Sequence, residues 1–101
     1  MRVSGHVTVG RVRHFRECDP ADKAMALKPL EEASEVLEAW KAWRGAQGGP
    51  PSAERRCRRA LLDEIADGVQ ALCNLAHAVG EDDLGEAMGR CEGRNRRRWR
   101  Y

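Results

Sequence analysis

Apolar residues recur at helical spacing over the segment Arg59–Gly80, RALLDEIADGVQALCNLAHAVG. At about 3.6 residues per turn they fall on one face of a helix. They are Leu61, Leu62, Ile65, Val69, Leu72, Ala76 and Val79. Gly80 suits the left-handed backbone conformation that often ends a helix. We therefore predict one long helix over this segment, with the charged residues 53–59 as its exposed first turns.

A second amphipathic segment, Lys28–Trp43, repeats this pattern. Its apolar face holds Ala33, Val36, Leu37 and Trp40. Asp19 and Pro20 are typical of a helix start, so we expect this first helix to begin near Pro20 with Asp19 as its N-cap. Pro29 lacks an N–H group and predicts that the helix either kinks or stops and restarts there.

A loop rich in Gly and Pro, residues 45–52, separates the two long helices, and a short polar connection favours an antiparallel hairpin. Asp83, with Glu86 three residues later, predicts a third helix that runs to about Arg97. Glycines recur along this helix at every fourth position, at Gly85, Gly89 and Gly93. Either the helix packs closely against the hairpin, which we favour, or it is only marginally stable. The predicted fold is all-α: a helical hairpin plus a C-terminal helix in residues 15–101, preceded by an N-terminal arm, residues 1–14.

Each long helix carries an acidic pair along the edge of its apolar face. The pairs are Glu32 with Glu35 and Glu64 with Asp67. If the apolar faces pack together, the two acidic edges can face each other across the seam of the hairpin. Four carboxylates that close together need a compensating cation, and oxygen ligands favour Mg²⁺ or Mn²⁺. This pattern indicates metal-assisted phosphoryl transfer or hydrolysis, and the competing interpretation is two ordinary solvated helix faces.

Two further polar residues border the acidic edges. Lys28 can contact a bound phosphate as a point charge, or it can form a surface ion pair with Glu32 one turn away. Asn74 lies two turns beyond Asp67 at nearly the same azimuth. It can hydrogen-bond a base or a sugar, or it can bond across a subunit interface. The sequence leaves both pairs of alternatives open.

The quartets Glu32-Ala-Ser-Glu35 and Glu64-Ile-Ala-Asp67, with 28 residues between them, resemble the ExxE…ExxD signature of the MazG-like all-α nucleoside triphosphate pyrophosphohydrolases. Glu31 also fits, since members often read EExxE. The resemblance implies that Glu32, Glu35, Glu64 and Asp67 hold Mg²⁺, with Mn²⁺ as an alternative. It also implies that Glu31 or Glu35 orients the attacking water. The implied reaction is hydrolysis of a (d)NTP between its α and β phosphates, which yields a (d)NMP and pyrophosphate.

The tail Arg90–Tyr101, RCEGRNRRRWRY, resembles the closing segment of the same family, in which an Asn and an Arg lie near the substrate phosphates. Asn95 and Arg98 match that segment. Members of the family frequently have a Lys four residues before this Asn, but that position is Cys91 here. The phosphate contact of that Lys therefore comes from Arg90 or Arg94, or it is missing.

The charge of the tail has two interpretations. Arg94–Arg100 contains five arginines, which predicts that the segment from Arg94 clamps a triphosphate. The alternative function is a non-catalytic helical module that binds nucleic acid or a protein partner through this tail. The acidic edges and the match at Asn95 favour the phosphate interpretation over nucleic acid.

The composition also bears on the oligomeric state and on the cellular compartment. A 101-residue chain with 42% hydrophobic residues, many of them Ala, would have a thin core as a monomer. We therefore expect a homodimer or homotetramer whose core is a four-helix bundle built from the hairpins of two subunits. Its four cysteines show no metal-binding spacing, and we expect free thiols in the cytoplasm with no membrane span. His6 and His14 have no carboxylate or cysteine at ligand spacing, so we interpret them as surface residues.

Overall fold

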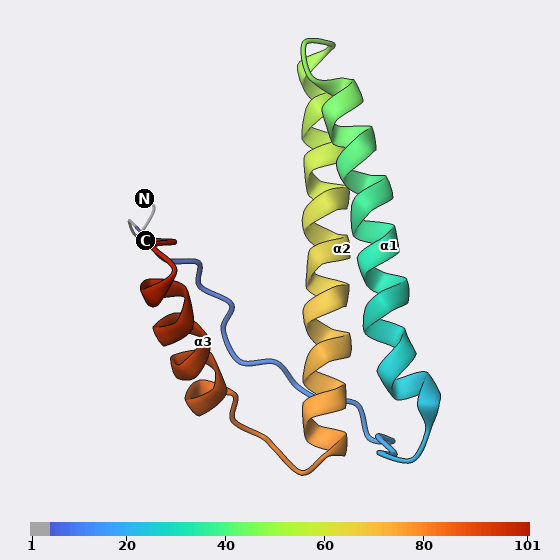
Figure 1. Ribbon diagram of the computed structural model, residues 1–101. Helices are drawn as coiled ribbons and strands as arrows, with labels where there is room; N and C mark the ends of the chain where they lie inside the picture. The colour runs from blue at the N-terminus through green and yellow to red at the C-terminus, as the bar shows by residue number, and fades with distance from the viewer. Residues whose placement is uncertain (1–4) are drawn as a thin grey trace.

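The structure is a computed structural model that describes residues 5–101, and within that range it contains three α-helices and no strand. Helix α1 spans Lys23–Ala46, α2 spans Pro51–Ala78 and α3 spans Gly85–Arg97. The two long helices α1 and α2 run antiparallel as a hairpin, while α3 stands to one side of it (Figure 1). The predicted all-α class is confirmed. Residues 1–4 of the predicted arm lie outside the described residues.

The start of α1 differs from the prediction. Asp22 is the N-cap, because its side chain accepts a hydrogen bond from the N–H of Ala24. The side chain of Asp19 instead accepts from the N–H of Ala21 and forms a separate turn before the helix. Pro29 lies inside α1, which continues to Ala46, so of the two predicted alternatives the stop and restart at this proline is wrong.

The hairpin packs through only part of the predicted apolar faces. The side of α2 that meets α1 contains the buried Ala71 and Asn74, while Leu62 and Leu72 of its apolar face stay largely exposed. On α1 the buried residue is Glu32. The seam therefore contains Glu32 and the half-buried Glu64, while the other two carboxylates of the acidic edges lie exposed at its rim. Val36 and Leu61 of the predicted apolar faces are half-buried, and most of the larger apolar side chains of these faces point outward. Helical periodicity groups residues by face, but it does not decide which face meets the neighbouring helix.

Small residues lie on the side of α2 that faces Glu32. A Cβ atom added to Gly68 would lie 4.0 Å from the Cβ of Glu32, which is ordinary van der Waals contact. Ala71 follows one turn later and is buried. This part of the seam thus lies beside Glu32, one turn from Glu64.

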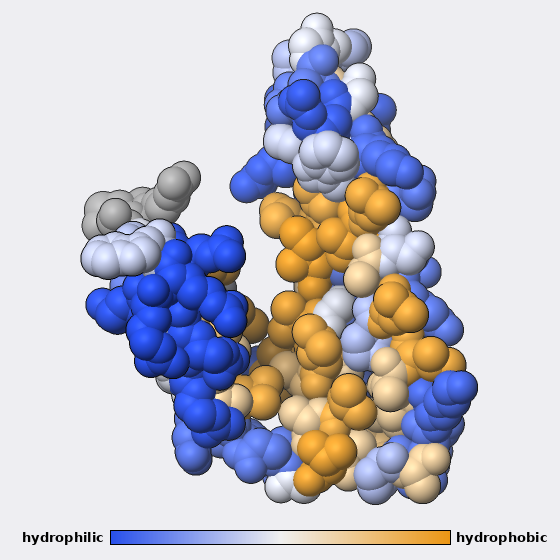
Figure 2. Space-filling view, viewed as in Figure 1, coloured by the Kyte–Doolittle hydropathy of each residue, from blue (hydrophilic) through white to orange (hydrophobic). Residues whose placement is uncertain are grey.

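The outward apolar faces leave the chain with almost no core. Among residues 5–101, Ala71 is the one buried apolar residue. Apolar side chains gather instead on the surface of the hairpin, and Figure 2 shows them on the side that faces α3. The exposed ones on the hairpin are Leu27, Leu30, Leu37, Trp40, Leu62, Ile65, Leu72 and Val79. The thin core predicted for a monomer is confirmed.

Helix α3 does not pack on the hairpin as predicted. No Cα atom of α3 lies within 8 Å of a Cα atom of α1 or α2. A Cβ atom added to Gly89 would meet nothing within 4 Å, so no close backbone approach accounts for this glycine. The helix is dominated by exposed charged residues, which gain nothing from burial against an apolar face.

Residues 5–22 form no helix or strand and run along α2 and past α3 (Figure 1). Two side chains of α2 hold this arm. The carbonyl of Arg13 accepts a hydrogen bond from Nε2 of Gln70 at 2.9 Å, and the N–H of Phe15 donates to Oδ1 of Asn74 at 3.0 Å. None of the helices described is long and apolar enough to cross a membrane.

Candidate functional site

Three carboxyl groups meet at the seam of the hairpin. Glu32 and Glu35 extend from α1, and Glu64 extends from α2. Each offers one carboxylate oxygen, and these oxygens all lie within 4.8 Å of one another. We call these three residues the acidic cluster. Their positions follow from the i, i+3 spacing on α1 and from the packing of α2 against α1.

Two oxygens of the acidic cluster are buried without a partner. Glu32 is 7% exposed, and one of its oxygens lies 3.3 Å from Nζ of Lys28. Its other oxygen, Oε2, is buried and makes no hydrogen bond; the same holds for Oε2 of Glu64. A buried acceptor without a donor costs about 1–3 kcal/mol, and more when it is charged. The acidic cluster is therefore an unsatisfied site in which a cation would be stabilising.

The electrostatics of Glu64 lead to the same conclusion. Burial raises the pKa of its carboxyl group above the ordinary value of 4.5, and the hydrogen-bonded carboxyl of Glu35 raises it further. The nearby charges of Glu35, Asp67 and Glu32 add to the shift. Like charges at this separation favour a bound proton unless a cation neutralises them.

The donor set fits a hard divalent ion. All three members of the acidic cluster offer carboxylate oxygens, which are typical ligands of Mg²⁺ and Mn²⁺. Three protein ligands leave further coordination positions for water and substrate phosphate. Asp67 lies outside the acidic cluster but close enough for its charge to act on Glu64, and it is exposed at the rim. The structure thus brings together three of the four predicted metal ligands and leaves the fourth next to them.

Lys28 and Glu31 lie beside the acidic cluster on α1. Nζ of Lys28 is 3.5 Å from a carboxylate oxygen of Glu31 and 3.3 Å from one of Glu32. The hydrogen bond to Glu32 and the two acidic charges raise the pKa of Lys28. The ion pair expected from the i, i+4 spacing is present, and more than half of the Lys28 side chain remains exposed toward solvent.

Asn74 binds the N-terminal arm through its side-chain oxygen. It is 6% exposed, and its Oδ1 accepts hydrogen bonds from the N–H of Phe15 and from Nε2 of Gln70, both at 3.0 Å. The predicted contact with a base or a sugar would have to use its amide nitrogen. Both donors to its Oδ1, Phe15 and Gln70, belong to the same chain, so neither bond crosses a subunit interface.

The predicted phosphate ligands of the tail lie away from the acidic cluster. Arg94 and Asn95 belong to α3, and Arg98 is its C-cap. Nδ2 of Asn95 lies 3.5 Å from Sγ of Cys91, while both arginines are exposed. Because α3 does not approach α1 or α2, the single chain does not form the predicted clamp over the acidic cluster.

Gly68 faces Glu32 across the seam, and the sequence interpretation assigned it no role. A Cβ atom there would lie 4.0 Å from the Cβ of Glu32, so this position also admits an alanine. Gly68 lies one turn after Glu64 in the sequence.

Comparisons of the chain with protein-family models, with curated proteins and with solved structures find no match. The geometry and charge of the acidic cluster are therefore the basis for inferring function.

Proposed function

We propose that this chain is a Mg²⁺-dependent nucleoside triphosphate pyrophosphohydrolase of the MazG-like type. Its reaction would convert a (d)NTP and water to a (d)NMP and pyrophosphate. The observation that carries the proposal is the convergence of Glu32, Glu35 and Glu64, with two buried carboxylate oxygens that lack partners.

The residues of the acidic cluster have different tasks in this proposal. Glu32 and Glu64, whose oxygens are buried, hold the metal, and Asp67 completes the site from the rim. When bound, Mg²⁺ neutralises phosphate charge and lowers the pKa of a coordinated water. Glu35 is exposed, so it can orient the attacking water and accept its proton. Glu31 is less well placed for this task, because it is paired with Lys28 and lies outside the acidic cluster.

In this proposal basic residues supply the positive charge that is still needed to neutralise a bound triphosphate. Lys28 lies at the edge of the acidic cluster with its side chain largely exposed, so it can exchange Glu31 for a phosphate oxygen. Arg94 and Arg98, with Asn95, are proposed to approach the site when the nucleotide binds, through movement of α3 about the loop between α2 and α3. Arginine is suited to this contact because it can bind phosphate with two parallel hydrogen bonds.

The proposed enzyme is an oligomer. The exposed apolar side chains of α1 and α2 are the surfaces that a second hairpin would cover to form a four-helix bundle. Such packing would supply the core that a single chain lacks.

A nucleotide panel tests the proposal. The full chain is incubated with Mg²⁺ and each canonical or modified (d)NTP, and both pyrophosphate and orthophosphate are measured. We expect pyrophosphate and the corresponding monophosphate in equal amounts from at least one nucleotide, with no activity in EDTA. Release of orthophosphate alone would show cleavage at the γ phosphate and contradict the proposed reaction.

A second candidate function rests on α3. This helix is detached from the hairpin, and all arginines from Arg94 to Arg100 are exposed. Such a surface suits non-specific binding of nucleic acid. A DNA mobility shift that weakens with salt and is unchanged in Glu64→Gln would favour this function, provided that the nucleotide panel shows no hydrolysis.

A further inference from the structure

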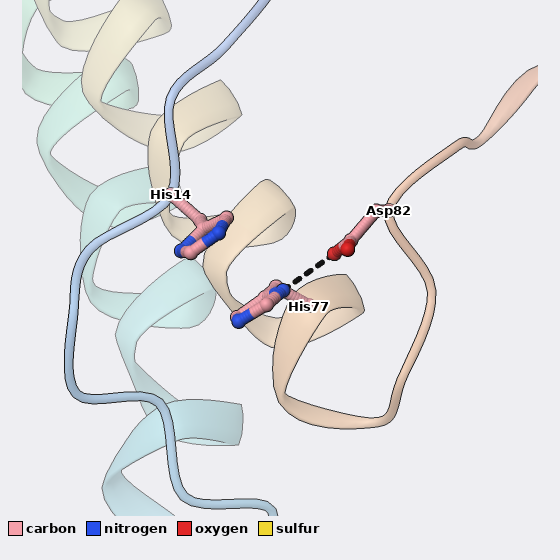
Figure 3. A group of neighbouring side chains, drawn as sticks. All are labelled: His14, His77 and Asp82. Carbon is pink, nitrogen blue, oxygen red and sulfur yellow. Dashed lines mark hydrogen bonds and ion pairs between the residues drawn. The ribbon is translucent and has the colours of Figure 1, made fainter.

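A second group of potential metal ligands lies at the other end of α2. His14 of the arm, His77 in the last turn of α2 and Asp82 of the following loop point toward one another (Figure 3). Each offers one ligand atom, and these atoms lie within 4.8 Å of one another. The three residues come from three different segments, and their sequence spacing gives no sign of the group.

The arm is held on both sides of His14. The carbonyl of Arg13 accepts from Gln70, and the N–H of Phe15 donates to the buried Asn74. Both partners belong to α2, and Asn74 precedes His77 by less than one turn. The backbone that carries His14 is therefore fixed over the turn that carries His77, and the two rings stack with centroids 3.4 Å apart.

The end of α2 brings Asp82 back to His77. Gly80 has φ +92°, its N–H donates to the carbonyl of His77, and the N–H of Glu81 donates to the carbonyl of Ala76. These two bonds and the left-handed glycine define a Schellman motif, which reverses the chain at a helix end. The reversal places Oδ1 of Asp82 2.5 Å from Nδ1 of His77.

The hydrogen bonds also fix which ring nitrogen of His14 can bind a metal. Nδ1 of His14 lies 2.7 Å from the carbonyl of Phe15, and a carbonyl can only accept, so Nδ1 carries the proton. Nε2 of the neutral ring is then the atom with the free lone pair. A ligating histidine typically has this arrangement, with its other nitrogen bonded to a carbonyl or a carboxylate.

We propose that His14, His77 and Asp82 bind one divalent transition-metal ion of the Zn²⁺ class. Two imidazole nitrogens and one carboxylate suit Zn²⁺ and its neighbours rather than Mg²⁺. The ion would take the place of the proton between His77 and Asp82, and that proton would leave to solvent. His14, which is exposed, would tilt out of the ring stack while its Nδ1 stays bonded to the carbonyl of Phe15, so that Nε2 faces the ion.

The bound ion would fasten the arm over a groove of about 750 Å³ between the arm, α2 and the start of α3. Glu81 and Asp83 flank Asp82 along this groove, and their charges favour a cation there. The site is separate from the acidic cluster and does not depend on the proposed hydrolase activity.

Calorimetric titration of the full chain with Zn²⁺, repeated by absorption with Co²⁺, tests the proposal. In excess Mg²⁺, which would occupy the acidic cluster, we expect one Zn²⁺ site per chain, with affinity reduced about tenfold or more by His14→Gln, by His77→Gln and by Asp82→Asn. His6→Gln is the matched control and should bind like the wild type. Glu64→Gln should also retain the Zn²⁺ site, which distinguishes it from the acidic cluster.

Limited trypsin digestion provides a second readout, the protection of the arm. This protection can be measured in the wild type even if a ligand variant folds poorly. Zn²⁺ should slow cleavage after Arg13 and Arg16 in the wild type and in His6→Gln but not in His14→Gln. The proposal is overturned if the wild type binds no Zn²⁺, if His14→Gln binds it as tightly as the wild type, or if Glu64→Gln abolishes the binding.

Discussion

Glu64 has a carboxyl group whose proton is bound more tightly in the folded chain than in the unfolded one, because burial and the carboxyls around it raise its pKa above 4.5. A raised carboxyl pKa gives stability at low pH that is lost as the pH rises through the folded value. We predict that the metal-free protein becomes less stable from about pH 4.5 upward through the raised pKa, and that the slope is shallower in Glu64→Gln. Thermal unfolding between pH 4.5 and 7 measures this slope, and saturating Mg²⁺ should reduce it. Equal slopes in the two proteins would show that Glu64 is not desolvated in solution.

Asn74 tests the attachment of the arm. Removal of its Oδ1 leaves the N–H of Phe15 without its acceptor, at a cost of about 1–3 kcal/mol in the free energy of unfolding. We predict this loss for Asn74→Ala, measured by urea unfolding, together with faster trypsin cleavage after Arg13. Asn74→Asp is the matched control, because it keeps an acceptor oxygen. A raised KM for nucleotide without loss of stability would instead favour the predicted role in binding the base or sugar.

Individual residues also show what the sequence can and cannot predict. Glu32, Glu35 and Glu64 could be placed together because a three-residue spacing fixes their relative azimuth, and two antiparallel helices have only a few ways to pair. His14 was interpreted as a surface residue, and it is exposed, but its partners His77 and Asp82 are separated from it by about sixty residues. Spacing rules detect ligands within one segment, and this group depends on how the arm crosses α2.

The helices themselves were largely predictable, whereas their packing was not. The repeat of apolar positions and the turn signal at Gly80 gave α2 and its end, and φ +92° at Gly80 confirms the left-handed cap. The face of α2 that meets α1 was predicted only in part, because Leu61 of the predicted apolar face is half-buried while Leu62 and Leu72 are about half exposed. Gly68 and Ala71 lie on the side of α2 that meets α1, and the choice of this side depends on packing that hydropathy does not describe.

Helix α3 allows a direct test of the proposed clamp. Arg94 and the residues after it lie apart from the acidic cluster in the single chain, so their contribution must come from movement or assembly. Each charge-assisted hydrogen bond to phosphate is worth about 1.5–3 kcal/mol, so two of them change kcat/KM by about a hundredfold or more. We predict a loss of this size when the chain is truncated after Gly93, with Mg²⁺ affinity and oligomeric state unchanged.

A double substitution separates the effect of losing charge in the tail from the effect of shortening the chain. Arg94→Gln with Arg98→Gln keeps the full chain and should reproduce most of the loss, whereas Arg97→Gln is the control outside the proposed contacts. Hydrolysis by the truncated protein at the wild-type rate would exclude the segment from Arg94 onward from the active site and favour its nucleic-acid function.

Many of the large apolar side chains of the chain are exposed, which is the basis for the proposed assembly. Leu37 is 52% exposed on α1, and burial of such a side chain is worth about 1.5–3 kcal/mol. We predict that the wild type sediments as a dimer or a larger oligomer at micromolar concentration. Leu37→Asp should weaken the assembly by about tenfold or more. Asp63→Lys, which reverses a charge at an exposed position on the side of α2 opposite its apolar face, should not. A monomeric wild type would contradict the four-helix-bundle proposal.

The acidic cluster is best examined with two adjacent carboxylates on α2. Glu64 belongs to the acidic cluster, whereas Asp63 is exposed and lies outside it. The measurement is the Mg²⁺-dependent rate of pyrophosphate release from the best (d)NTP substrate by the wild type, Glu64→Gln and Asp63→Asn, with folding checked by circular dichroism. We predict that Glu64→Gln loses at least about 99% of the rate, while Asp63→Asn stays within about twofold of the wild type. Equal rates for the wild type and a folded Glu64→Gln would show that the acidic cluster is not the catalytic metal site.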